Sequence, residues 1–214
     1  MRHISELQKT LSDFFDWNKA RISCLSQILQ ALFCVKTVNL AQIALAFQTQ
    51  TKKESAYRRV CRFFTGFSFD LSSIVLIVLK VFSLQGKHLL IIDRTNWKWG
   101  KTPINILMVS ISYLGIGIPL FWAVLDLDGT SCLEDRASLL ERVLEKFGLQ
   151  KIEAVIADRE FVGKKWFHFL IENKIPFVIR VKGHFMADGI RCNYAVPLKT
   201  LYKYMGPTKE NSQP

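Results

Sequence analysis

The chain has 214 residues and half of them are hydrophobic, so it can bury a core, and wholesale disorder is excluded. Its formal net charge of +11 points to a polyanionic partner, with nucleic acid favoured over an anionic membrane surface. Its five cysteines are scattered without a CxxC pair, which argues against zinc and favours reduced thiols in a cytoplasmic protein.

The first part of the chain, residues 1–86, is expected to be a helical, basic, DNA-binding region. Apolar residues recur there at helical spacing, and Asn39 is expected to cap a short helix that ends near Phe47. After a polar turn at 48–51, a helix over 52–64 directs cations outward, and an apolar helix over 71–82 follows. Helix, short turn and basic helix fit a helix-turn-helix-like module that lays cations along phosphates, although the solvated face of an ordinary bundle helix is an equal alternative. The candidate DNA-contacting residues are Lys52, Lys53, Arg58, Arg59 and Arg62.

The uncharged stretch 104–125 is long enough to span a membrane, but its composition argues against a helix. The segment Gly115–Pro119 interrupts it, and β-branched and aromatic residues dominate both halves. Two buried strands joined by a glycine turn explain the stretch better, so no membrane partner is expected.

Residues 87–183 contain a regular succession of strands and helices. The pattern predicts strands at 88–93, 106–114, 120–126, 153–158 and 176–182, with helices at 134–147 and 164–173 and a loop at 94–103. The order β-β-β-α-β-α-β predicts an α/β fold, a mixed sheet in which strand 153–158 pairs beside a central strand 88–93. This topology is similar to that of ribonuclease-H-like nucleases and strand-transfer enzymes. Residues 184–214 are expected to hold the start of further strands and a frayed polar tail.

Two aspartates stand at the ends of two of these strands. Asp93 follows the apolar run 89–92, Asp158 follows the apolar run 154–157, and an arginine comes after each aspartate. A single aspartate at the end of a strand more often forms a turn. Because the same pattern occurs twice, we favour a role that the two aspartates share. Two carboxylates that meet at one edge of adjacent parallel strands offer the hard oxygen ligands that Mg²⁺ or Mn²⁺ prefers.

The same residues resemble a known family. The run Ile92–Trp97 resembles the first acidic motif of DDE-type bacterial insertion-sequence transposases, the large IS-four-like group. Ala157–Phe161, followed by Trp166 and Pro176–Lys182, is similar to that group's second acidic motif. The resemblance implies metal-dependent cleavage at a transposon end and transfer of the new 3′-hydroxyl to target DNA. It implies that Asp93 and Asp158 are catalytic residues and metal ligands, with DNA as the partner and no small-molecule cofactor.

Further residues near the two aspartates are expected to contact the substrate. The cations Arg94, Arg159, Arg180 and Lys182 lie near the expected sheet rim and are predicted to contact phosphates. Trp97 and Trp99 either stack on a base or anchor their loop in the core, and we favour the anchor.

The resemblance stops before the family's third acid, a glutamate in a Tyr…Arg…Glu…Lys signature. Past strand 176–182 the remaining acids are Asp188, beside a glycine, and Glu210, in a polar tail. Glu160 is too close to Asp158 to replace the missing ligand and is expected on the other face of the strand. In the family a β-rich insertion precedes this glutamate, so the resemblance implies that residues 184–214 are the start of a truncated β-rich insertion. The chain is therefore expected to be a C-terminally truncated transposase, inactive alone. One alternative is a non-catalytic DNA-binding remnant that associates with a full-length relative through its N-terminal helices. Another is a stand-alone ribonuclease-H-like nuclease.

Overall fold

The computed structural model describes residues 2–48, 52–65, 71–125, 131–188 and 195–204. The chain divides into two compact units, Met1–Leu84 and Gln85–Pro214. Residues 49–51 of the polar turn expected at 48–51, and the tail beyond 204, lie outside the described residues.

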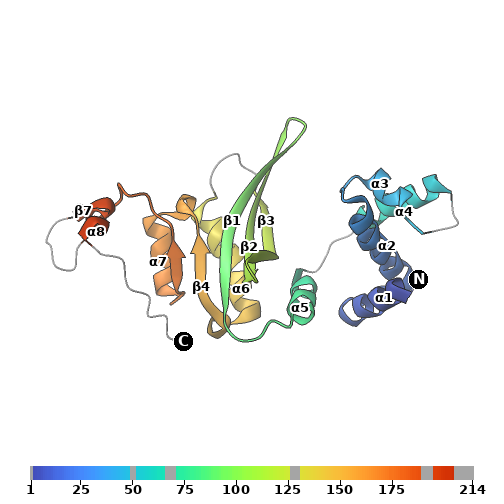
Figure 1. Cartoon of the computed structure of the whole chain (residues 1–214), viewed down its shortest axis with the longest axis horizontal. Helices are drawn as coiled ribbons and strands as arrows, with labels where there is room; N and C mark the ends of the chain where they lie inside the picture. Colours follow the sequence, from blue (N-terminus) through green and yellow to red (C-terminus); the bar gives the residue numbers. More distant parts are fainter. Residues whose placement is uncertain (1, 49–51, 66–70, 126–130, 189–194, 205–214) are drawn as a thin grey trace. The chain divides into compact units, whose positions relative to one another are not determined.

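The first unit is helical, as predicted. Its helices are α1 (Arg2–Phe14), α2 (Lys19–Val35), α3 (Leu40–Leu45), α4 (Lys53–Phe64) and α5 (Leu71–Val81) (Figure 1). Asn39 caps α3, because its Oδ1 accepts the backbone N–H groups of Ala41 at 3.0 Å and Gln42 at 3.3 Å. Apolar side chains of α1 to α4 form one core, in which Val60 of α4 is fully buried.

The second unit is built on a five-stranded mixed sheet in the described part of the chain. The strands are β1 (His88–Trp99), β2 (Thr102–Tyr113), β3 (Ile116–Leu125), β4 (Ile152–Ala157) and β5 (Phe177–Ile179), in the order β3-β2-β1-β4-β5. β1, β2 and β3 form an antiparallel meander, while β4 runs parallel to both β1 and β5. The predicted mixed sheet, and the predicted pairing of the first strand with the fourth, are confirmed.

The uncharged stretch 104–125 is the β2–β3 hairpin, as its composition predicted. Its turn consists of Leu114 and Gly115, which both have positive φ, as a two-residue type I′ turn requires. Within the described ranges, no helix combines the length and the apolar character needed to cross a bilayer.

Two helices of the second unit, α6 (Leu133–Phe147) and α7 (Lys164–Glu172), pack on one face of the sheet. Arg142 of α6 lies 5.4 Å from the ring centre of Phe121, and Phe167 of α7 stacks on Phe177 of β5. The register places Phe121 and Phe177 on the same face as the buried residues Leu90 and Ile92 of β1. The opposite face carries the exposed side chains of Val124 and Val178.

The bounds of two predicted segments are wrong. The segment 94–103 is not a loop, because β1 continues to Trp99 and pairs with β2 as far as Thr102. The only non-strand residues between the two strands are Gly100, with φ +61°, and Lys101, which form a tight turn. β5 is shorter than predicted, since residues 180–182 follow the strand.

Past β5 the described chain forms a small separate sheet. β6 (Met186–Asp188) pairs antiparallel with β7 (Ala195–Pro197), and α8 (Leu198–Tyr204) follows. Asp188 is therefore the last residue of a strand and not a turn residue, and this strand does not belong to the main sheet.

Candidate metal and nucleic-acid site

The parallel pairing of three neighbouring strands stops at the same level of the sheet. Ile92 of β1 pairs with Ala157 of β4, and Ala157 pairs with Ile179 of β5. The next residues along the three strands are Asp93, Asp158 and Arg180. All three residues are exposed, and the register places them next to one another across the sheet, directly past the last parallel pairs.

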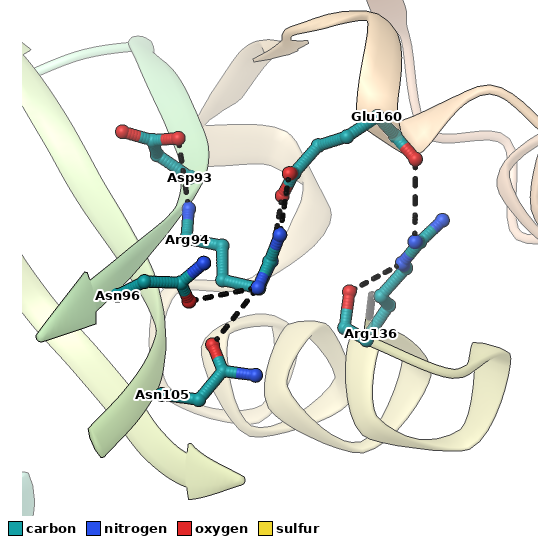
Figure 2. Close-up of polar contacts among 7 residues, drawn as sticks. Asp93, Arg94, Asn96, Asn105, Arg136 and Glu160 are labelled. Carbon is teal, nitrogen blue, oxygen red and sulfur yellow. Dashed lines mark hydrogen bonds and ion pairs between the residues drawn. The ribbon is translucent and has the colours of Figure 1, made fainter. Parts of the chain in front are cut away.

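Asp93 and Arg94 point to opposite faces of β1 because successive strand residues alternate. Asp93 lies on the face that α6 and α7 leave open, and its Oδ1 accepts the Arg94 backbone N–H at 2.8 Å (Figure 2). Arg94 lies on the helix-covered face, where only 11% of its side chain remains exposed. The alternation thus gives two adjacent charged residues opposite environments.

The guanidinium of Arg94 is held by four hydrogen bonds. Its Nε and one terminal nitrogen donate to the two carboxylate oxygens of Glu160 at 3.2 and 3.1 Å, a bidentate ion pair. The other terminal nitrogen donates to the side-chain oxygens of Asn96 at 2.8 Å and Asn105 at 3.2 Å. Arg94 is therefore engaged within the protein, and the expected phosphate contact would need this network to open.

Glu160 does not lie on β4, so the prediction that it points to the other face of that strand is wrong. It belongs to a 3₁₀ turn, Arg159–Phe161, that directly follows Asp158. Because its carboxylate binds Arg94, the ion pair ties the segment after Asp158 to the segment after Asp93 (Figure 2). The pair thus joins β1 and the end of β4 directly beyond the two aspartates.

A second arginine supports this turn from α6. Arg136 donates to the Ser131 hydroxyl at 2.8 Å and to the Glu160 backbone carbonyl at 3.4 Å, and its guanidinium lies 4.8 Å from the ring centre of Phe161. Burial lowers the pKa of the Arg136 guanidinium, while the nearby Glu160 carboxylate acts in the opposite direction. Through these contacts Arg136 fixes the position of the turn.

The other predicted cations divide into two groups. Exposed side chains are those of Lys52, Lys53, Arg58, Arg62, Arg159, Arg180 and Lys182. Arg59 instead donates to the Ala20 carbonyl at 3.2 Å and is half-buried, so it joins α4 to α2. Arg59 and Arg94 have structural partners, whereas the exposed cations can reach a phosphate backbone.

Trp97 does not anchor its segment in the core, because 63% of it is exposed. It lies on β1 beyond the end of the β4 pairing, on the same strand face as Asp93. The favoured reading of this residue from the sequence is wrong.

Sequence reasoning missed the network around Arg94. Asn96, Asn105, Arg136 and the role of Glu160 depend on strand register and on the turn after β4, neither of which has a local sequence signal. The closest signal was the run Asp158-Arg159-Glu160, in which the second acid follows the first too closely to be a co-ligand.

Asp93 and Asp158 have the ligand chemistry that a divalent cation requires. Both are carboxylates, both are exposed, and their strands are parallel neighbours. Among the described residues, no group of three or more His, Cys, Asp or Glu side chains is placed to hold a metal ion. Of the other acids considered, Glu160 is bound to Arg94, Asp188 is on the separate sheet, and Glu210 lies outside the described residues.

Comparison with known proteins gives only weak structural similarity to solved structures. No family model and no curated protein matches the chain. A cryo-EM structure of the simian T-cell lymphotropic virus intasome in complex with PP2A regulatory subunit B56 gamma matches with 11% sequence identity and a TM-score of 0.36. The match covers 66% of this chain and 47% of that chain, so it spans about half the length of the matched protein.

Proposed function

We propose that the chain is a DNA-binding protein of the DDE transposase class, with a ribonuclease-H-like sheet that carries the first two acids of the metal site. The observation that carries the proposal is the register of β1 and β4. Ile92 and Ala157 are paired on parallel neighbours, so Asp93 and Asp158 follow side by side. The strand order β3-β2-β1-β4-β5, with a central β1, supports the ribonuclease-H-like fold.

Asp93 and Asp158 would hold Mg²⁺ or Mn²⁺ through carboxylate oxygens. Such an ion stabilises developing negative charge at phosphorus and activates a water or hydroxyl nucleophile. Arg180, next to Asp158 in register, and the exposed Arg159 and Lys182 would bind the phosphate backbone beside the acids. The Arg94–Glu160 pair would fix the spacing of the two segments that carry the aspartates.

The helical unit would supply sequence-independent affinity for DNA. Lys53, Arg58 and Arg62 are exposed on α4, whose opposite face is buried through Ala56, Val60 and Phe63. With Lys52 just before the helix, these cations would neutralise phosphates. Self-association and a cytoplasmic location remain part of the proposal.

A second candidate is a non-catalytic DNA-binding protein. The engagement of Glu160 by Arg94 favours it, because the acid nearest to the aspartate pair is already neutralised. This candidate keeps the DNA contacts and lacks strand cleavage.

Metal titration tests the proposal without requiring activity. We expect Asp93→Asn and Asp158→Asn each to weaken Mn²⁺ binding, measured by electron paramagnetic resonance, by about tenfold or more, since each removes a charged ligand. Glu153→Gln, at an exposed position at the start of β4, is the matched control and should bind Mn²⁺ as the wild type does. Unchanged Mn²⁺ binding in both aspartate variants would rule out the site.

Nicking of supercoiled DNA separates the two candidates. Cleavage that requires Mg²⁺ or Mn²⁺ and disappears in the Asp93→Asn variant would support the enzyme. DNA binding with a steep salt dependence, without nicking in either metal, would support the non-catalytic protein.

A further inference from the structure

The β1–β2 hairpin extends beyond the rest of the sheet as a two-stranded arm. Within the described residues, β1 pairs with β4 up to Ile92 and β3 pairs with β2 up to Asn105, whereas β1 and β2 remain paired to Trp99 and Thr102. We call residues 96–105 the hairpin arm. Figure 1 shows the β1–β2 hairpin projecting past the ends of β3 and β4. Two-stranded ribbons are marginally stable by themselves, so this arm depends on the sheet at its base.

The arm presents an exposed aromatic ring, followed by one lysine on the opposite strand face and one in the turn. Trp97 is 63% exposed, and the side chains of Lys98 and Lys101 are also exposed. Cross-strand pairing opposes Trp97 to Ile104, so the indole stands on the strand face that also carries Asp93. An exposed indole can stack on a nucleobase, and neighbouring ammonium groups can bind the adjoining phosphates.

We propose that the hairpin arm binds unpaired nucleotides of a DNA end, with Trp97 stacking on a base and Lys98 and Lys101 on the backbone. The inference rests on the proposed DNA-binding function and specifies the form of DNA that the site takes. Bases inside an intact duplex are covered by their neighbours, so the indole face can act only where a base is unstacked.

The distance along β1 places this contact relative to the two aspartates. Trp97 lies four residues past Asp93, which is about 13 Å at the usual rise of an antiparallel strand. At about 3.4 Å per nucleotide of a stacked strand, the stacked base lies about four nucleotides from a phosphate held at Asp93. The arm and the aspartate pair can therefore contact one strand at the same time.

The test compares two labelled DNA probes by fluorescence anisotropy. One is a duplex with a single-stranded overhang of about four nucleotides, and the other is a covalently closed circular duplex, which has neither an end nor an unpaired base. We expect Trp97→Ala to weaken binding to the overhang probe by about ten- to a hundredfold and to leave binding to the closed probe unchanged. Trp97→Phe, which keeps an aromatic ring, should retain most of the preference for the overhang.

A matched control is available at the tip of the other hairpin. Leu114→Ala changes an exposed apolar side chain in the β2–β3 turn and should affect neither probe. Lys98→Ala and Lys101→Ala should each weaken binding to the overhang probe. Each variant should also lower the number of counterions released on binding, read from the slope of log affinity against log salt concentration, by about one. A 2-aminopurine base in the overhang should be quenched by the wild type and not by Trp97→Ala.

The outcomes distinguish a failure of the proposed role of the hairpin arm from a failure of the proposed DNA-binding function. If the wild type binds neither probe, the proposed DNA-binding function fails, and the inference fails with it. If the wild type binds DNA and Trp97→Ala lowers both affinities equally or neither, only the role of the arm is overturned. A change of sedimentation coefficient in Trp97→Ala without DNA would instead assign Trp97 to a protein contact and reject the inference.

Discussion

Replacing Glu160 by glutamine tests whether the ion pair with Arg94 holds the sheet end together. The substitution keeps the size of the side chain but removes its negative charge. It also replaces one carboxylate oxygen, which accepts a hydrogen bond from the guanidinium, by an NH₂ group, which can only donate. With side-chain exposures of 11% for Arg94 and 27% for Glu160, the pair lies between a solvent-exposed and a buried ion pair. Exposed pairs contribute about 0–1 kcal/mol, and breaking a buried pair costs about 3–5 kcal/mol. We therefore expect Glu160→Gln to lower the free energy of unfolding by about 2 kcal/mol.

Urea unfolding followed by tryptophan fluorescence provides the assay. Four of the five tryptophans lie in the unit 85–214, so the signal reports mainly on the sheet. Glu172→Gln is the matched control, because Glu172 pairs with His168 at 3.0 Å on α7 with both side chains mostly exposed. This control should change stability by less than about 0.5 kcal/mol. Equal stabilities for the two variants would refute the assignment of Arg94 and Glu160 as a structural clamp.

Three further predictions concern single positions. Leu114 has φ +49° and is 87% exposed, so Leu114→Asn should stabilise the type I′ turn by about 1 kcal/mol and raise the thermal midpoint by about 2–4 °C in a melting experiment. An unchanged midpoint would show that the turn carries no strain. Cys132 caps α6, with its sulfur accepting the Asp135 N–H at 3.4 Å. Cys132→Ser should strengthen this cap and raise the midpoint, and a lower midpoint would contradict the capping role. Burial raises the pKa of the Cys24 thiol, which leaves less thiolate at mildly alkaline pH. In timed alkylation followed by mass spectrometry, Cys24 should therefore react much more slowly than the exposed Cys34, and equal rates would show that Cys24 is accessible.

Features with a strong local signal were predictable from the sequence. Asn39 stands before a short apolar run and caps α3, and Gly115 interrupts an uncharged stretch at the β2–β3 turn. The continuous apolar runs before Asp93 and Asp158 indicated strands buried inside a parallel pair, and the two strands are neighbours. In each case the signal lies within a few residues of the feature.

Features that depend on distant pairing were not predictable. From Arg94 to Trp99 polar and apolar residues do not alternate regularly. The sequence therefore did not indicate that the strand continues past Asp93. Its partner, β2, determines that continuation. The burial of Arg94 follows from the helices on that face of the sheet, and the exposure of Trp97 follows from the end of the β4 pairing.

The parallel pairing of β1 with β4 also bears on how the protein folds. β2, β3 and α6 all lie between these strands in sequence, so the chain must close a long loop before any contact compensates for the lost entropy. The meander β1-β2-β3 needs only neighbouring segments. We expect it to form first, with β4 docking afterwards. A nascent chain that pauses on the ribosome before β4 emerges would then hold an ordered meander with a solitary Asp93. The proposed pair of carboxylates would be complete only after β4 has docked.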